Sequence, residues 1–137
     1  MKNNSFTVAV LGAGNIGSAV IERLLEVDNE VLNLSLSKVL VSDLSKERDI
    51  DGGLLTTDFD EILNDENIDL VIEVLGGVEP GKGYIKDLLE SGKSVITANK
   101  DIVADCGSEL IQIAQKNNVC LYFEAAVAAG IPVLKPL

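Results

Sequence analysis

The chain has 137 residues, of which 47% are hydrophobic and only 4% aromatic, and its formal net charge is −11. This length suggests one domain, and the scarcity of aromatic residues predicts an aliphatic core of the kind found in a parallel sheet covered on both faces. The acidic balance argues against nucleic acid and against an anionic membrane as partners.

Strand-like and helix-like segments alternate along the chain. Strands are expected over residues 6–11, 38–42, 69–75, 94–97 and 119–123, with room for a short one at 54–56. Helices are expected over 15–27, 58–63, 80–91 and 101–116, the last one broken near Gly107, and 28–37 is expected to be a loop. This alternation predicts an α/β fold: a Rossmann-type doubly wound, mainly parallel sheet with helices on both faces.

Two of the helices carry local signals. In the helix at 15–27, Ile16, Val20 and Leu24 share one face, which we expect to be buried. Asp58 and Glu61 stand three residues apart, which is the spacing of a capping box at a helix start.

The first strand runs into a glycine-rich turn. Residues 8–17 read Val-Ala-Val-Leu-Gly-Ala-Gly-Asn-Ile-Gly, so that Gly12, Gly14 and Gly17 have the G-x-G-x-x-G spacing. Gly12 permits the tight turn, Gly14 lets a pyrophosphate approach the backbone, and Gly17 lets the helix pack closely on the strand. The free N–H groups at the start of the helix carry a partial positive charge that favours an anion. The pattern predicts dinucleotide binding; the alternative is a tight turn that binds nothing.

Other candidate residues follow the remaining strand ends, where sheets of this kind bind ligands. Asp43 could accept hydrogen bonds from the adenosine ribose, or cap the next segment. Gly76 and Gly77 suit close approach of the nicotinamide ribose or the pyrophosphate, or form a plain turn. Lys100 could orient a substrate oxygen or hold a cofactor group by charge, or be an ordinary exposed lysine.

The segment 124–132 reads Glu-Ala-Ala-Val-Ala-Ala-Gly-Ile-Pro. One carboxylate together with several backbone carbonyls is the donor set of a small hard-cation site. The alternative is a close-packed helix start held by small residues, and these residues alone favour that alternative.

Three runs together closely resemble homoserine dehydrogenase. They are Asp-Leu-Val-Ile-Glu-Val-Leu-Gly-Gly-Val-Glu-Pro at 69–80, Val-Ile-Thr-Ala-Asn-Lys at 95–100 and Tyr-Phe-Glu-Ala-Ala-Val-Ala-Ala-Gly-Ile-Pro at 122–132. The family reduces aspartate 4-semialdehyde to homoserine with NADPH or NADH, on the route to threonine and methionine. The resemblance covers nearly the whole chain and implies that residues 1–137 are an NAD(P)-binding domain.

The resemblance also implies residue roles. The residues implied to line the dinucleotide are Gly12, Ala13, Gly14, Asn15, Ile16, Gly17 and Gly76, with Gly130 near cofactor and substrate. Lys100, in Thr-Ala-Asn-Lys, is the implied catalytic lysine between cofactor and substrate. The implied monovalent cation, Na⁺ or K⁺, is held by Glu124 and the carbonyls of Val127, Ala129 and Ile131.

The chain departs from the family in several places. Many relatives have Ser and Gly where this chain has Ala126 and Ala129, and Arg where it has Ser42. An arginine there can meet a 2′-phosphate, so its absence, like the presence of Asp43, favours NADH. The family's substrate domain is expected beyond residue 137. We therefore expect residues 1–137 to bind NAD(P) weakly and not to catalyse the reaction. A homo-oligomer is also expected.

Alternative functions remain open from the sequence. One is another oxidoreductase of amino-acid metabolism, such as aspartate dehydrogenase or aspartate-semialdehyde dehydrogenase. The latter needs a nucleophilic cysteine, and neither Cys106, in a helix, nor Cys120, in a strand, is suitably placed. The other is a non-enzymatic nucleotide-sensing module. The sequence begins without a signal peptide or spanning segment and has no Cys-x-x-Cys pair, so a cytoplasmic location is expected.

Overall fold

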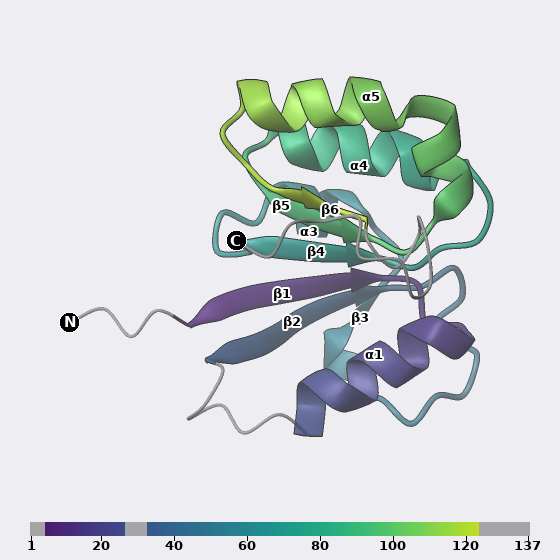
Figure 1. The fold of residues 1–137 in the computed structure, drawn as a ribbon. Coiled ribbons are helices and arrows are strands. Elements are labelled where there is room, and N and C mark those ends of the chain that lie inside the picture. Colours follow the sequence, from purple (N-terminus) through teal and green to yellow (C-terminus); the bar gives the residue numbers. More distant parts are fainter. Residues whose placement is uncertain (1–4, 27–32, 124–137) are drawn as a thin grey trace.

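Six parallel strands form one sheet in the spatial order β3-β2-β1-β4-β5-β6 (Figure 1). The computed structural model describes residues 5–26 and 33–123. The strands are β1 (Phe6–Leu11), β2 (Leu34–Leu40), β3 (Leu55–Thr56), β4 (Leu70–Glu73), β5 (Ser94–Thr97) and β6 (Leu121–Tyr122). The chain adds strands outward from β1, first on one side and then on the other, which is the strand order of the Rossmann fold. The predicted fold class is therefore confirmed.

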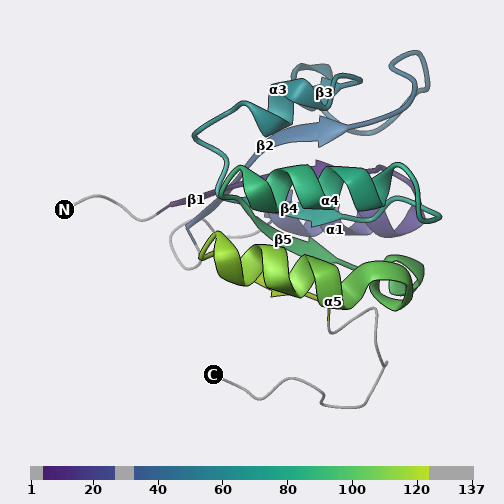
Figure 2. The same cartoon turned by 90° about the horizontal axis from the view of Figure 1, so that it is seen from above.

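Helices cover both faces of the sheet. They are α1 (Asn15–Glu26), α3 (Asp60–Leu63), α4 (Gly81–Glu90) and α5 (Lys100–Lys116), with a 3₁₀ turn, η1 (Gly52–Leu54). Figure 1 shows α1 below the sheet and α4 and α5 above it, and Figure 2 shows α4 and α5 running side by side. This is the doubly wound arrangement, in which every central strand is buried on both faces.

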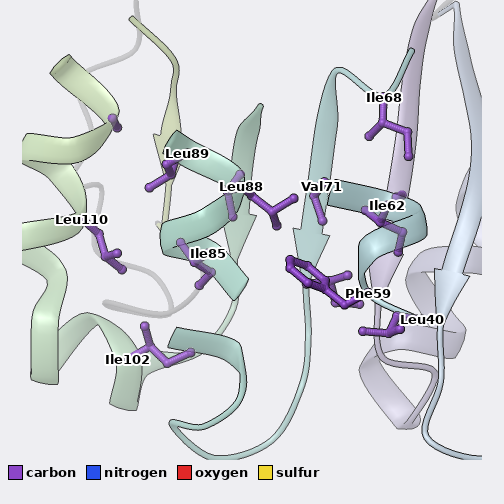
Figure 3. Packing of buried hydrophobic residues seen from close by; sticks show 14 of the residues in the cluster. Leu40, Phe59, Ile62, Ile68, Val71, Ile85, Leu88, Leu89, Ile102 and Leu110 are labelled. Carbon is purple, nitrogen blue, oxygen red and sulfur yellow. The ribbon is translucent and has the colours of Figure 1, made fainter. Parts of the chain in front are cut away.

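The larger core lies between the sheet and the layer of α3, α4 and α5. Figure 3 shows Ile85 and Leu88 of α4 between Leu110 of α5 and Val71 of the sheet. The ring of Phe59 stacks on that of Tyr84 at a centroid distance of 3.9 Å. A smaller apolar cluster lies on the opposite face and consists of Val10, Ile21, Val39 and Val41.

The strand register brings four strand ends level. Leu11, the last residue of β1, pairs with Leu40 of β2 and with Glu73 of β4. Glu73 in turn pairs with Thr97, the last residue of β5. The loops that follow these strands therefore meet at one edge of the sheet, toward which the arrowheads point in Figure 1.

The second strand is longer than the sequence indicated. β2 begins at Leu34, within the predicted loop at 28–37, and ends at Leu40 rather than at residue 42. Its partner β3 pairs only with Val39 and Leu40, so that the first part of β2 has a sheet neighbour on one side only. Such an edge tolerates Ser35 and Ser37, whose polarity had favoured a loop.

Both local helix signals were wrong in part. Val20 and Leu24 are partly buried against the smaller cluster, as predicted, but Ile16 is 61% exposed, and the buried residues of α1 are Gly17 and Ile21. The reason is that the glycine turn sets Gly17 against the sheet, which rotates Ile16 outward. Asp58 and Glu61 form no capping box, because the Glu61 carboxylate instead accepts a hydrogen bond from Nζ of Lys38 at 3.1 Å.

One predicted helix end and one predicted helix break are confirmed. Gly92 follows α4 with a φ of +87°, the left-handed conformation that glycine adopts at helix ends without strain. The predicted break near Gly107 is a kink at Cys106, whose φ of −145° is not helical.

Truncating Leu110 to alanine is expected to lower the free energy of unfolding by about 3 kcal/mol. Leu110 is only 2% exposed and fills the space between α4 and α5, so the truncation leaves a cavity. The neighbouring Ile111 is 36% exposed, and Ile111→Ala should cost less than about 1 kcal/mol. Urea denaturation of both variants tests this, and equal losses would contradict the packing described.

Candidate functional site

In the glycine turn after β1, two of the three glycines have no room for a side chain, and the third has an open side. Gly12 has a φ of +105°, and a Cβ atom there would lie 3.1 Å from the carbonyl oxygen of Val74. A Cβ atom on Gly17 would lie 2.2 Å from the carbonyl oxygen of Gly12. Around Gly14, in contrast, no described atom lies within 4 Å of the Cβ position. Gly12 and Gly17 thus shape the turn, and Gly14 leaves its outer side accessible.

A cavity of about 470 Å³, called here the turn cavity, opens beside this turn. Its lining comes mainly from the loops after β1, β2 and β4, with Tyr84 from α4, and includes Gly12, Ala13, Gly14, Ser42, Lys46, Arg48 and Gly76. The described residues that line it include two cations and no acid, in a chain with a net charge of −11. Local charge therefore favours an anionic ligand here, although the whole chain repels anions.

A second cavity, of about 650 Å³, lies along the side of α1 and is called here the helix cavity. It shares Ala13, Gly14, Lys46 and Arg48 with the turn cavity. It adds Asn15 and Ser18, and its lining also includes four acids, Glu22, Glu26, Glu47 and Asp49. The amide groups of residues 15–17 precede the first intrahelical hydrogen bonds, so they are available to an anion at the start of α1. The two cavities meet where a pyrophosphate would lie against such a turn.

Lys46 and Arg48 line both cavities and are candidate site residues that the sequence did not reveal. Nη1 of Arg48 donates to the carbonyl oxygens of Asp43 and Lys46, at 2.7 Å and 3.2 Å. Nε of Arg48 is buried, and within the described residues it has no hydrogen-bond partner. In the sequence, these two residues form only a Lys-x-Arg pair in the loop after a strand. The spacing of such a pair does not predict that it lies beside the glycine turn.

Asp43 binds its own loop in this structure. Its exposed carboxylate accepts hydrogen bonds from the backbone N–H and the hydroxyl group of Ser45, at 2.8 Å and 2.6 Å. These two bonds hold the pKa of Asp43 below its usual value. Asp43 lines neither the turn cavity nor the helix cavity. The geometry matches the capping role that the sequence offered as the alternative.

The remaining predicted residues are partly brought together. Gly76 lines the turn cavity, and Gly77 follows with a φ of +74°. Lys100 is exposed at the start of α5, at the same edge of the sheet, but lines neither cavity. Ile16 is exposed and lines neither cavity. The predicted residues Glu124, Val127, Ala129, Gly130 and Ile131 lie outside the described residues.

A buried glutamate links the loops after β4 and β5. Glu73 is completely buried, and its carboxylate accepts hydrogen bonds from the N–H of Leu75 at 2.7 Å and from the hydroxyl group of Thr97. Burial outweighs these two bonds and raises the pKa of Glu73 above the usual glutamate value. In the sequence, Glu73 is an acidic residue within an apolar strand, and no role was predicted for it.

Residues 5–26 and 33–123 contain neither a candidate metal cluster nor a candidate membrane-spanning helix. No group of three or more Cys, Asp or Glu side chains there is arranged to hold a metal ion. Of the helices described, none has the length and apolar character needed to cross a membrane.

Comparison with known proteins identifies the family. The family described as "Homoserine dehydrogenase, NAD binding domain" matches residues 12–124. The chain belongs to this family. The resemblance seen in the sequence is thereby confirmed, and the nucleotide that such a domain holds is an NAD-type dinucleotide.

Homoserine dehydrogenases of known sequence and structure are similar over almost the whole chain. Those of Bacillus subtilis and Mycobacterium bovis are 43% and 46% identical to it, in each case over 95% of this chain. Crystal structures from Staphylococcus aureus (pH 7.5) and Thiobacillus denitrificans superpose with TM-scores of 0.84 and 0.83, at 39% and 35% identity over 93% and 95% of this chain. The chain spans only 31–33% of the length of these homoserine dehydrogenases.

Proposed function

We propose that this domain binds NAD(P) for a homoserine dehydrogenase, the enzyme that interconverts L-homoserine and L-aspartate 4-semialdehyde. The observation that carries the proposal is the turn cavity, where an unobstructed Gly14 backbone, a helix start and two cations converge. Such a site suits a pyrophosphate, because backbone N–H groups and nearby cations both favour negative charge.

Roles for the individual residues follow from this. Gly12, Ala13, Gly14, Asn15, Gly17 and Gly76 surround the dinucleotide, with Gly77 beside it. The bound cofactor supplies hydride transfer, and the protein supplies orientation and charge. Lys100 orients the substrate oxygen and stabilises negative charge that develops on it, because its cationic side chain extends from the edge at which the nicotinamide lies.

The cofactor that the site favours is NADPH. The sequence favoured NADH, because Ser42 replaces an arginine and Asp43 follows it. However, Asp43 is bonded to Ser45, whereas Lys46 and Arg48 line the turn cavity, where no described lining residue is acidic. A 2′-phosphate on the adenosine ribose would bring a double negative charge to these two cations, which an unphosphorylated ribose cannot do.

Two further predictions rest on the resemblance alone. One is a monovalent cation held by Glu124 and the carbonyls of Val127, Ala129 and Ile131, with Gly130 beside cofactor and substrate. The other is assembly of the enzyme as a homo-oligomer.

Titration calorimetry with NADPH and NADH tests the proposal on the 137-residue chain. We expect both to bind, NADPH more tightly, and we expect no oxidation of homoserine. The reason is that the resemblance assigns the acidic substrate-binding residues and a further catalytic lysine to positions after residue 137. Failure of both nucleotides to bind at millimolar concentration would refute the proposal, and rapid turnover would show that the catalytic residues are misassigned.

One alternative enzyme class loses support. A semialdehyde dehydrogenase that uses a thiol nucleophile needs an accessible cysteine that ionises readily. Cys106 is buried, and burial raises the pKa of its thiol. Its Sγ contacts the carbonyl oxygen of Ile102 at 3.4 Å. Cys120, the other cysteine of the chain, is exposed and precedes β6 at the amino end of that strand, away from the carboxyl edge.

A further inference from the structure

We propose that Glu73 is a positioning residue, whose buried carboxyl group fixes the loop that carries Gly76 and Gly77 relative to the helix start that carries Lys100. The inference rests on the proposed function, because it takes both segments as parts of the site around the nicotinamide. Glu73 acts through its neighbours and does not itself touch a ligand.

The carboxyl group of Glu73 joins two adjacent strand ends. Strands β4 and β5 are neighbours in the sheet (Figure 1). Glu73 ends β4 and pairs with Thr97, which ends β5. One carboxylate oxygen accepts from the N–H of Leu75 at 2.7 Å, and the other accepts from the Thr97 hydroxyl group. The Thr97 oxygen accepts in turn from the N–H of Asn99 at 3.0 Å. One side chain thus sets the start of the loop after β4 and the start of the loop after β5.

Asn99 completes the connection between the two loops. Its Nδ2 donates to the carbonyl oxygens of Leu75, at 3.3 Å, and of Gly77. Its Oδ1 accepts from the N–H groups of Asp101 and Ile102 at 3.1 Å and 3.2 Å, and so caps α5. Because Lys100 is the first residue of α5, a change at Glu73 reaches both the glycine loop and the lysine.

Glu73 is an unfavourable residue for a buried strand. Burial favours its neutral form, so its contribution to stability is present below the ordinary glutamate pKa and is lost as the pH rises through the raised pKa of the folded state. An apolar residue would avoid that loss, whereas the carboxylate offers two acceptors that hold two loops. Residues that break the local rule of burial are expected at functional sites.

No nearby charge compensates this carboxylate. The titratable groups of the two helices packed against it are, before and on α4, Glu79, Lys82, Tyr84, Lys86, Asp87 and Glu90, and, on α5, Lys100, Asp101, Asp105, Cys106, Glu109 and Lys116. Within the described residues, Glu73 forms hydrogen bonds only with Leu75 and Thr97 and has no ion pair. Lys82 pairs with Asp105 instead, at 2.9 Å. A change in the protonation of Glu73 therefore acts first on the two groups that donate hydrogen bonds to it, the N–H of Leu75 and the hydroxyl group of Thr97.

Protonation of Glu73 is expected to loosen the connection. An ionised carboxylate accepts both hydrogen bonds, whereas a protonated carboxyl group donates to the Thr97 oxygen and so reverses the bond between the two side chains. The Thr97 oxygen must then accept from both Glu73 and the N–H of Asn99, and the Thr97 hydroxyl hydrogen no longer has the carboxylate as its acceptor. Affinity for the cofactor should fall as the pH is lowered through the pKa of Glu73.

The test is a pH series of NAD⁺ binding to the 137-residue chain, from about pH 5 to about pH 8. NAD⁺ is the probe because it lacks the 2′-phosphate, which itself titrates near pH 6. The variants are Glu73→Gln, Thr97→Val and the control Glu66→Gln, which changes an exposed glutamate elsewhere. Amide chemical shifts of Gly77 and Lys100 are followed over the same range.

Wild type and Glu66→Gln are expected to bind NAD⁺ about five- to tenfold more weakly at the acidic end, the effect of about one lost hydrogen bond. Glu73→Gln should bind weakly at every pH, without this profile, and Thr97→Val should be weakened to a similar degree at pH 8. The Gly77 and Lys100 shifts should titrate with one midpoint in wild type and not in Glu73→Gln.

Other results would overturn the positioning role, or would refute the proposed function and leave that role standing. An unchanged pH profile or unchanged shift titrations in Glu73→Gln would overturn the positioning role, even if that variant is less stable. The same conclusion follows if Thr97→Val binds NAD⁺ as wild type does. If the shifts titrate together as expected but NAD⁺ does not bind at any pH, the connection stands and the proposed function fails.

Discussion

Gly17→Ala is expected to destabilise the domain by about 3 kcal/mol or more, and to abolish nucleotide binding with it. The added Cβ atom would lie 2.2 Å from the carbonyl oxygen and 2.8 Å from the carbonyl carbon of Gly12. Both are backbone atoms of a turn held by a hydrogen bond from the N–H of Gly12 to Leu40 at 2.9 Å, so neither can move without pulling β1 from β2. Urea denaturation measures the loss.

Gly14→Ala is the matched control for this prediction. The substitution is the same and lies in the same turn, but no described atom lies within 4 Å of the Cβ position. Stability should change by less than about 1 kcal/mol. Nucleotide affinity should still fall about tenfold or more, because the new methyl group occupies the surface that a pyrophosphate approaches. Equal stability of the two variants would contradict the described turn, and unchanged affinity in Gly14→Ala would place the nucleotide elsewhere.

Lys46→Glu and Arg48→Gln are each expected to weaken NADPH binding about tenfold or more, and NADH binding much less. A hydrogen bond to a charged group contributes about 1.5–3 kcal/mol, and only the 2′-phosphate of NADPH offers that extra charge to these side chains. Arg48 also bonds two carbonyl oxygens of its own loop, so glutamine is preferred to a smaller residue. Calorimetry with both nucleotides gives the ratio of the two affinities.

Lys116→Glu is the control for long-range charge. Lys116 is exposed in the last turn of α5 and lines neither cavity, so its reversal changes the net charge by the same amount as Lys46→Glu. The ratio of NADPH to NADH affinity should stay as in wild type, because salt screens distant charges. A parallel fall for both nucleotides in Lys46→Glu would show that the lysine does not distinguish them.

The sequence by itself determined the fold class, the succession of strands and helices along the chain, and the glycine turn. These follow from patterns that span only a few residues: apolar runs, strand–helix alternation, and glycines whose spacing reflects a local steric need. It also supplied the family, because three separate motifs retain their order along the chain. The sequence-based predictions were wrong where tertiary packing overrode local polarity or periodicity. One case is β2, which begins at Leu34 on the open edge of the sheet, and the other is Ile16, which the packing of Gly17 turns outward.

Only the tertiary structure decided what meets at the carboxyl edge of the sheet. Lys46 and Arg48 are separated from the glycine turn by about thirty residues of sequence, and a loop path that no periodicity encodes brings them beside Gly14. Likewise, Glu73 and Thr97 come into contact because the register of β4 and β5 pairs them. Register and loop path depend on packing between distant segments, so the charges of this site became visible only in the folded chain.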